Sequence, residues 1–299
     1  MTAYDPDNDP RLDPRVRAIL KMVPSGPSPT YASREATIEA ARSPEALANA
    51  QTARDLMELC DTEEVVTSAG LELWAEKIES QPDGNTIHLQ IVRPSGNAVV
   101  PCVYYIHGGG MASLSCTMGN YRAWAKIIAH HGICVVMVEF RNSMQPSSVE
   151  DIAPFPGGLN DCVSGLKWVQ GHANELHIDP KRIVVSGESG GGNLALAVGL
   201  ELKRLGEEGF VKGIYAFCPF IAGEYPRPEL PSTTENNGIF INLGGNGPAM
   251  AYGIEHLTSR NPIAWPYWAS SDDLAGFPTT VISVNECDPL RDEGIAFYR

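Results

Sequence analysis

Residues 184–197 read Val-Val-Ser-Gly-Glu-Ser-Gly-Gly-Gly-Asn-Leu-Ala-Leu-Ala, and the rest of the chain is organised around this stretch. An apolar β-branched pair enters it, a Gly-x-Ser-x-Gly turn follows, and an Ala/Leu-rich helical pattern leaves it. Such a strand–turn–helix context is typical of a nucleophile elbow, in which a sharp turn exposes the serine hydroxyl. Glycine at positions 187 and 191 removes side chains that would clash in the turn. The stretch therefore predicts that Ser189 is a nucleophile at the start of a helix, whose N–H groups favour developing negative charge.

A glycine-rich turn between strand and helix can also bind phosphate, or it can simply reverse the chain. No lysine follows the glycines here, which argues against a phosphate-cradling loop. The flanking strand and helix patterns favour the nucleophile instead.

The composition is that of a soluble globular protein. The 299 residues are 43% hydrophobic and 19% charged, and no stretch is apolar and long enough to span a membrane. A formal charge of −14 disfavours nucleic acids and anionic membranes as partners. The seven scattered cysteines contain no Cys-x-x-Cys pair, so we expect no disulfide framework and no metal site. Together with the absence of a signal peptide pattern, this indicates a cytoplasmic location.

Strand and helix patterns alternate through most of the chain. The expected strands cover residues 65–67, 71–78, 87–92, 99–106, 133–138, 183–186, 213–217 and 279–284. Helical patterns cover residues 13–20, 33–42, 44–59, 121–131, 159–170 and 292–299, besides the helix after Ser189. The alternation predicts an α/β fold with a mostly parallel sheet and right-handed crossovers.

We expect four segments. Residues 1–62 form N-terminal helices that contribute to a cap, and residues 63–219 form the core. Residues 220–273 form a cap or lid inserted between two strands, because a structureless loop of that length is uncommon. Residues 274–299 return to the core. Three aromatic residues of the insertion either line a pocket or pack in the core; they are Trp265, Tyr267 and Trp268.

Acyl transfer needs a nucleophile, a base, a group that orients the base, and donors for the oxyanion. The loop 107–110, His-Gly-Gly-Gly, follows a buried strand and lets backbone N–H groups approach a ligand; such a loop supplies one oxyanion donor, and the residue after the nucleophile, Gly190, supplies another. The acid is expected after a later strand, where Asp288 stands. Glu286 and Asp292 are its rivals, although Asp292 looks like the cap or first turn of a helix.

Three ordered motifs resemble the hormone-sensitive-lipase family of esterases. They are residues 105–111 (Tyr-Ile-His-Gly-Gly-Gly-Met), 187–193 and 288–294 (Asp-Pro-Leu-Arg-Asp-Glu-Gly). With residues 261–267 (Asn-Pro-Ile-Ala-Trp-Pro-Tyr), they look most like the brefeldin A esterase branch. The resemblance implies an α/β-hydrolase fold with a helical cap, and cofactor-free hydrolysis of carboxylic esters with short acyl groups.

Position by position, the resemblance marks Ser189 as nucleophile and Asp288 as the triad acid. The oxyanion donors fall on Gly109, Gly110 and Gly190, and the oxyanion loop is supported by His107 and Gly108. Many family members carry Asp and Ala on either side of the serine, where this chain has Glu188 and Gly190.

One family feature is missing. The family's catalytic histidine lies beyond the acid, past one more strand, and this sequence has no histidine after His256. His256, in the insertion, is the one histidine of the chain with a route to the site. We therefore expect the last strand, the catalytic histidine and the last helix to lie beyond Arg299. Without that base, the 299 residues alone would be nearly inactive.

The leading hypothesis is a serine carboxylesterase that acts on a small-molecule ester through an acyl-enzyme. One alternative is a non-catalytic binding protein on the same scaffold, like the gibberellin receptors, which resemble this family but lack the catalytic histidine. Another is an acyltransferase or amidase that uses the same triad. The sequence leaves a homodimer open.

Overall fold

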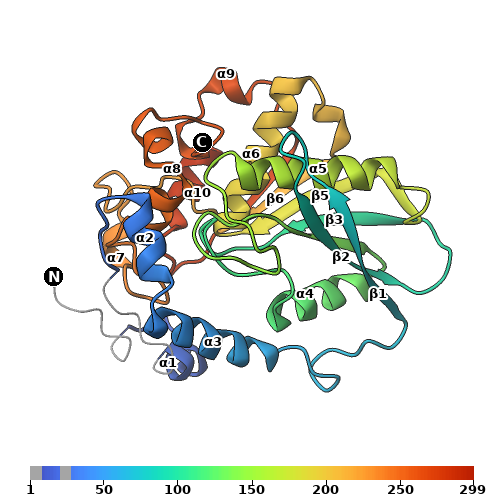
Figure 1. The fold of residues 1–299 in the computed structure, drawn as a ribbon, viewed down its shortest axis with the longest axis horizontal. Coiled ribbons are helices and arrows are strands. Elements are labelled where there is room, and N and C mark those ends of the chain that lie inside the picture. The colour runs from blue at the N-terminus through green and yellow to red at the C-terminus, as the bar shows by residue number, and fades with distance from the viewer. Residues whose placement is uncertain (1–8, 21–27) are drawn as a thin grey trace.

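The computed structural model describes residues 9–20 and 28–299, and its centre is a seven-stranded sheet (Figure 1). The strands are β1 (Leu71–Glu79), β2 (Thr86–Pro94), β3 (Val100–Ile106), β4 (Cys134–Glu139), β5 (Ile178–Glu188), β6 (Gly213–Phe217) and β7 (Thr280–Ser283), in the order β1-β2-β4-β3-β5-β6-β7. β1 and β2 pair antiparallel, as do β2 and β4, whereas the remaining pairs are parallel. The prediction of a mostly parallel α/β sheet is confirmed.

Helices cover both faces of this sheet. They are α1 (Pro14–Leu20), α2 (Arg34–Ala41), α3 (Pro44–Glu58), α4 (Gly119–Ala129), α5 (Gly157–Gly171), α6 (Gly190–Leu205), α7 (Ser232–Glu235), α8 (Gly247–Thr258), α9 (Ser271–Leu274) and α10 (Arg291–Tyr298), with short 3₁₀ turns η2 (Glu208–Phe210) and η3 (Pro266–Trp268). In Figure 1, α5 and α6 lie above the sheet and α4 lies below it. The core is split accordingly, because successive strand residues face opposite sides. Tyr104 packs in the cluster beneath α5 and α6, and Tyr105 packs with Tyr121 of α4.

Residues 65–67 do not form the predicted strand. The N–H groups of Val65 and Val66 both donate to the Thr62 carbonyl, at 3.0 and 2.9 Å, so the chain turns here. The Glu63 carboxylate then accepts hydrogen bonds from Thr67 and Ser68. This local side-chain capping overrides the β-propensity of the two valines.

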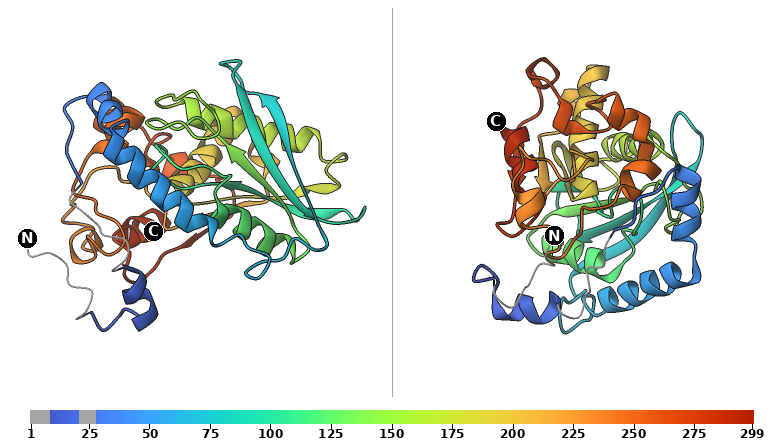
Figure 2. Two further views of the ribbon diagram at one scale, coloured as in Figure 1. Left: turned by 60° about the horizontal axis from the view of Figure 1, so that its bottom comes forward. Right: turned by 90° about the vertical axis from the view of Figure 1, so that its left-hand side faces the viewer.

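Helix α2 and the residues before it lie beside the insertion. Ser33 and Ser43 cap α2 and α3, and α2 packs against α8 (Figure 2). The backbone N–H of Tyr31 donates to the Asn246 side chain at 2.8 Å, and Arg34 donates to the Ala251 carbonyl at 3.1 Å. Residues 1–8 and 21–27 of the expected segment 1–62 lie outside the described residues.

The insertion 220–273 contains ordered structure, namely α7, α8, η3 and α9. It covers the carboxyl ends of the strands, since a Cβ on Gly110, just beyond β3, would lie 3.2 Å from Pro248 of α8. None of the helices in the described ranges is long and apolar enough to cross a membrane.

Candidate active site

Ser189 stands at the turn between β5 and α6 with φ +54° and ψ −117°. A residue with a Cβ rarely adopts such a backbone conformation, which persists only where its surroundings fix it. Two backbone hydrogen bonds do so here. The Ser189 N–H donates to the Phe217 carbonyl at 2.9 Å, and the Ser189 carbonyl accepts from the Phe220 N–H at 3.0 Å. β6 and the start of the insertion therefore hold the elbow.

The glycines of the elbow are required by close backbone approach. A Cβ on Gly191 would collide with the Ile106 carbonyl oxygen, and one on Gly187 would collide with the Gly191 carbonyl oxygen. A Cβ on Gly190 would lie 2.6 Å from the backbone nitrogen of Gly110. The elbow and the loop after β3 are therefore in direct backbone contact, as their places on adjacent parallel strands led us to expect.

The loop after β3 has an unusual backbone. Gly109, Gly110 and Met111 have φ values of +98°, +64° and +56°. Within the described part of the chain, the N–H groups of Gly109, Gly110 and Gly190 have no hydrogen-bond partner. Three unpaired donors on two touching segments form the arrangement that can receive an oxyanion.

His107 supports this loop from beneath. Its ring is fully buried and stacks on Phe140, with ring centroids 4.3 Å apart, and its Nδ1 lies 2.9 Å from the Gly108 carbonyl oxygen. Burial lowers the pKa of His107, which favours the neutral ring. The His107 side chain therefore packs under the loop and has a structural role, not one in proton transfer.

Glu188, the residue before the serine, ties the elbow to the loop, a role that the sequence analysis did not assign. Its carboxylate accepts hydrogen bonds from the Tyr121 hydroxyl at 2.6 Å, the Tyr105 hydroxyl at 2.9 Å and the Gly108 N–H at 3.0 Å. Burial raises the pKa of Glu188 to about 7. The signal available in the sequence was a carboxylate at the end of a buried strand, which needs partners.

Asp288 follows β7 and is half-buried, and burial raises the pKa of its carboxyl group. The carboxylate lies beside Cys218, the residue after Phe217. Burial and, next, the Asp288 charge raise the pKa of the Cys218 thiol to about 12. The structure thus places Asp288 at the end of β6, whose Phe217 carbonyl accepts the Ser189 N–H.

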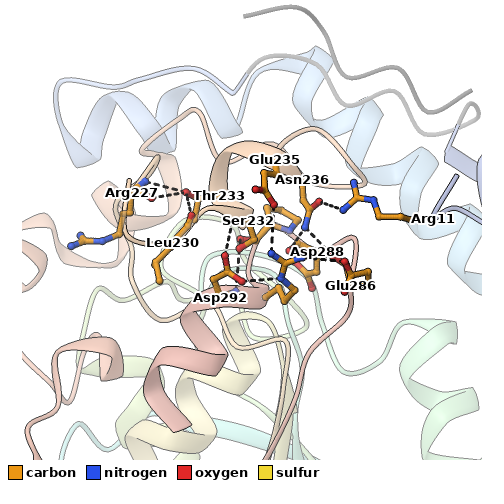
Figure 3. Close-up of polar contacts among 12 residues, drawn as sticks. Arg11, Arg227, Leu230, Ser232, Thr233, Glu235, Asn236, Glu286, Asp288 and Asp292 are labelled. Carbon is orange, nitrogen blue, oxygen red and sulfur yellow. Dashed lines mark hydrogen bonds and ion pairs between the residues drawn. The ribbon is translucent and has the colours of Figure 1, made fainter. Parts of the chain in front are cut away.

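Helix α7 and its flanking residues hold the Asp288 loop (Figure 3). The buried Asn236 side chain donates to the carbonyl oxygens of Glu286 and Asp288 at 3.0 and 3.1 Å, and it accepts from Arg11 at 2.9 Å. Ser232 Oγ donates to the Pro289 carbonyl at 2.9 Å. The loop is therefore fixed by the insertion and by the N-terminal segment.

The two rivals of Asp288 have structural partners. Asp292, in the first turn of α10, accepts from the Ser232 N–H at 2.7 Å and from Arg291 Nε at 2.8 Å. Although burial raises its pKa, these hydrogen bonds leave it below the usual value. Glu286 is exposed and pairs with Arg291 at 3.3 Å. Both carboxylates stabilise the loop instead of facing the serine.

The hydrogen-bonded histidines have partners other than Ser189. In residues 9–20 and 28–299, no hydrogen bond joins an imidazole nitrogen to Ser189. His256 packs edge-on against Phe155 with centroids 4.6 Å apart, and its Nδ1 lies 3.3 Å from Asn261 Nδ2. The structure therefore does not bring His256 to the site. The described residues also contain no cluster of three His, Cys, Asp or Glu that could hold a metal, and the seven cysteines are free thiols.

A cavity of about 310 Å³ lies next to the elbow. Its walls include Phe220, whose N–H binds the Ser189 carbonyl, and Pro248, which covers Gly110. Mostly apolar residues line the rest. Of the three aromatic residues left open by the sequence, Trp265 is fully buried and packs edge-on against Phe220 in the core. Trp268 lines a second cavity.

The sheet, the elbow after β5 and the loop after β3 define an α/β hydrolase. The chain belongs to the family of proteins with the alpha/beta hydrolase fold, whose profile matches residues 103–299. A Mycobacterium tuberculosis protein named carboxylesterase NlhH is 29% identical over 201 residues, covering 66% of this chain and 59% of the relative. An arylesterase of Saccharolobus solfataricus is 28% identical over 249 residues, covering 76% and 74%.

Two groups of solved structures are similar to nearly the whole of this chain. A structure of esterase Est22 is 54% identical with a TM-score of 0.97, covering 99% of this chain and 86% of that one. Brefeldin A esterase, titled a bacterial homologue of human hormone-sensitive lipase, is 36% identical with a TM-score of 0.84, covering 98% and 82%. The predicted membership of the hormone-sensitive-lipase family is confirmed. The chain spans 59% of the length of the first curated relative.

Proposed function

We propose that this chain carries the site of a serine carboxylesterase for short-chain acyl esters. The observation that carries the proposal is the strained Ser189, held against the loop after β3, with three backbone N–H donors on these two segments that have no partner among the described residues. Relatives named carboxylesterase and esterase support it.

In the proposed reaction, the base takes the proton of the Ser189 hydroxyl while Oγ attacks the ester carbonyl carbon, and the carbonyl oxygen becomes an oxyanion. The N–H groups of Gly109, Gly110 and Gly190 receive that charge. Collapse of the tetrahedral intermediate expels the alcohol, which takes a proton from the base, and leaves an acyl-enzyme. Water, deprotonated by the same base, then releases the acid. Asp288 orients the base and stabilises its protonated form.

The base is proposed to be a histidine other than the seven of this sequence. Support comes from the hydrogen bonds of the imidazoles, because none in the described ranges joins an imidazole nitrogen to Ser189. The complete natural gene product should therefore be heavier than 32.3 kDa and contain a further histidine. An intact mass that matches these 299 residues would contradict this part of the proposal.

The mostly apolar lining of the cavity beside the elbow supports an aliphatic acyl group, and its volume of about 310 Å³ lies at the small end of the usual range of ligand pockets, which favours short chains. We propose that residues 1–62 and 220–273 form the cap that closes it, with residues 63–219 and 274–299 as the core. A cytoplasmic location is proposed from the seven free thiols, and nucleic acid is not expected as a partner because of the charge of −14.

Hydrolysis of a chromogenic butyrate ester by the intact enzyme tests the proposal. Ser189→Ala should lower kcat by about 10⁴-fold or more, because the covalent route is lost. The matched control is Ser259→Ala, which removes a hydroxyl from the exposed end of α8. Ser189→Ala enzyme with undiminished kcat would contradict the assignment.

A second candidate is a binding protein on the same scaffold, favoured by the absence of an imidazole partner for Ser189 within the described residues. An unactivated serine reacts poorly with organophosphates. Such a protein would bind an ester reversibly without forming a covalent adduct or releasing alcohol.

A further inference from the structure

A second cavity of about 570 Å³ adjoins the one beside Ser189. Four residues line both cavities, namely Gly223, Tyr225, Gly245 and Ala249. The two cavities are therefore neighbours that share Tyr225 in their walls. The second cavity has the more polar lining of the two.

Two arginines of the second cavity stack on one tryptophan. The guanidinium carbon of Arg260 lies 4.4 Å from the Trp268 ring centroid, and that of Arg227 lies 4.8 Å from it. Arg227 is already neutralised, because its Nε donates to Glu229 at 2.8 Å and its Nη1 lies 3.6 Å from Glu224. Arg260 has no carboxylate partner among the residues that the structure describes.

The stacked arginine is suited to an anion. A guanidinium that lies over an aromatic face keeps its N–H edge free and pre-oriented, and this edge matches a carboxylate. The buried Nε1 of Trp268 also has no hydrogen-bond partner in the described residues. The chain as a whole carries −14, yet among the described residues that line this cavity Glu224 is the one acidic side chain. The local field therefore favours a negative group where the rest of the surface repels one.

We propose that this second cavity is a subsite for a carboxylate, with Arg260 as its main partner, so that the preferred substrates are esters that also carry a carboxylate group. The inference deepens the proposed esterase function and rests on it for the ester. The carboxylate lies in the second cavity while the ester carbonyl lies at Ser189. Arg227 stays paired with Glu229 and packs over Trp268 beside Arg260.

Equilibrium binding tests the subsite separately from turnover. The Ser189→Ala chain is titrated calorimetrically with monoethyl adipate and with ethyl hexanoate, which differ only in a terminal carboxylate against a methyl group. We expect monoethyl adipate to bind about tenfold more tightly, as one charge-assisted hydrogen bond to a partly exposed arginine allows. Raising the salt concentration should weaken the binding of monoethyl adipate alone.

Two substitutions test whether Arg260 causes the preference for the carboxylate ligand. Arg260→Gln, made in the same Ser189→Ala chain, should remove the tenfold preference, because it removes the charge-assisted hydrogen bonds to the carboxylate. It should leave the affinity for ethyl hexanoate within about twofold, since the stack of Arg260 on Trp268 that is also lost involves no group of that ligand. Arg182→Gln is the matched control, because Arg182 is an exposed arginine paired with Asp179 near the start of β5. It should leave both affinities unchanged.

Every other result of the binding experiment overturns the subsite proposal. Equal affinities for the two ligands, or a preference that survives Arg260→Gln, would refute the carboxylate subsite while leaving the esterase proposal intact. A preference lost equally in Arg182→Gln would show a general charge effect and refute it too. Failure to bind either ligand would refute both proposals, whereas failure of the intact enzyme to hydrolyse any ester, with the preference present, would refute only the esterase.

Discussion

At the scale of single residues, the site depends on positions where no side chain fits. Gly191 is the clearest case, because a Cβ there would meet the carbonyl oxygens of Ile106 and His107, which are backbone atoms of a central strand. Backbone of this kind cannot move aside as a flexible side chain can. The strain at Ser189 is tolerated because these contacts leave the chain no alternative path.

Gly191→Ala should therefore lower the free energy of unfolding by about 3 kcal/mol, the upper range for overpacking a core. The matched control is Gly171→Ala at the end of α5, where a Cβ would meet nothing within 4 Å. That change should be neutral or stabilising by up to about 1 kcal/mol. Urea unfolding followed by circular dichroism measures both, and equal losses in the two variants would contradict the packing argument.

At the scale of elements, one buried carboxyl group joins α10 to the start of the insertion. Glu293 is fully buried and accepts hydrogen bonds from the N–H groups of Ile221 and Ala222, at 3.1 and 3.0 Å, and from the Tyr225 hydroxyl at 2.8 Å. Phe220, one residue earlier, binds the elbow. The carboxyl group thus fixes Tyr225, which lies between the two cavities.

Burial raises the pKa of Glu293 to about 8, above an ordinary value near 4.5. Between these values the folded chain holds a proton that the unfolded chain releases, so this group's stabilisation is complete below about pH 4.5 and is lost as the pH rises through about 8. Glu293→Gln cannot titrate. The difference in free energy of unfolding between wild type and Glu293→Gln should therefore fall by about 3 kcal/mol between pH 5 and pH 8. Urea titrations at both pH values measure it, and a difference that stays constant would contradict the account.

At the scale of the whole molecule, the features that can be predicted from the sequence are those that short stretches of residues determine. The elbow, the loop at 107–110 and the strand–helix alternation are local patterns, and the structure has each of them. The role of Glu188 depends on tyrosines of β3 and α4, and that of Asn236 on a loop some fifty residues away, as its bond to Asp288 shows. Such contacts arise from the tertiary fold and have no periodicity. The strand predicted for residues 65–67 was wrong for a local reason, because side-chain capping competed with a weak strand pattern.

The proposed function requires that Ser189 is a nucleophile beside an oxyanion site and that its base is a group other than the imidazoles of the described residues. Phosphonylation of the 299-residue chain by a fluorophosphonate, with and without added imidazole, tests this most directly by mass spectrometry of the modified peptide. We predict a single adduct on Ser189 that forms slowly alone and about tenfold faster with imidazole, which replaces part of a general base's contribution. The adduct should be absent from Ser189→Ala. An adduct spread over other serines, or none on Ser189 with imidazole present, would contradict the claim.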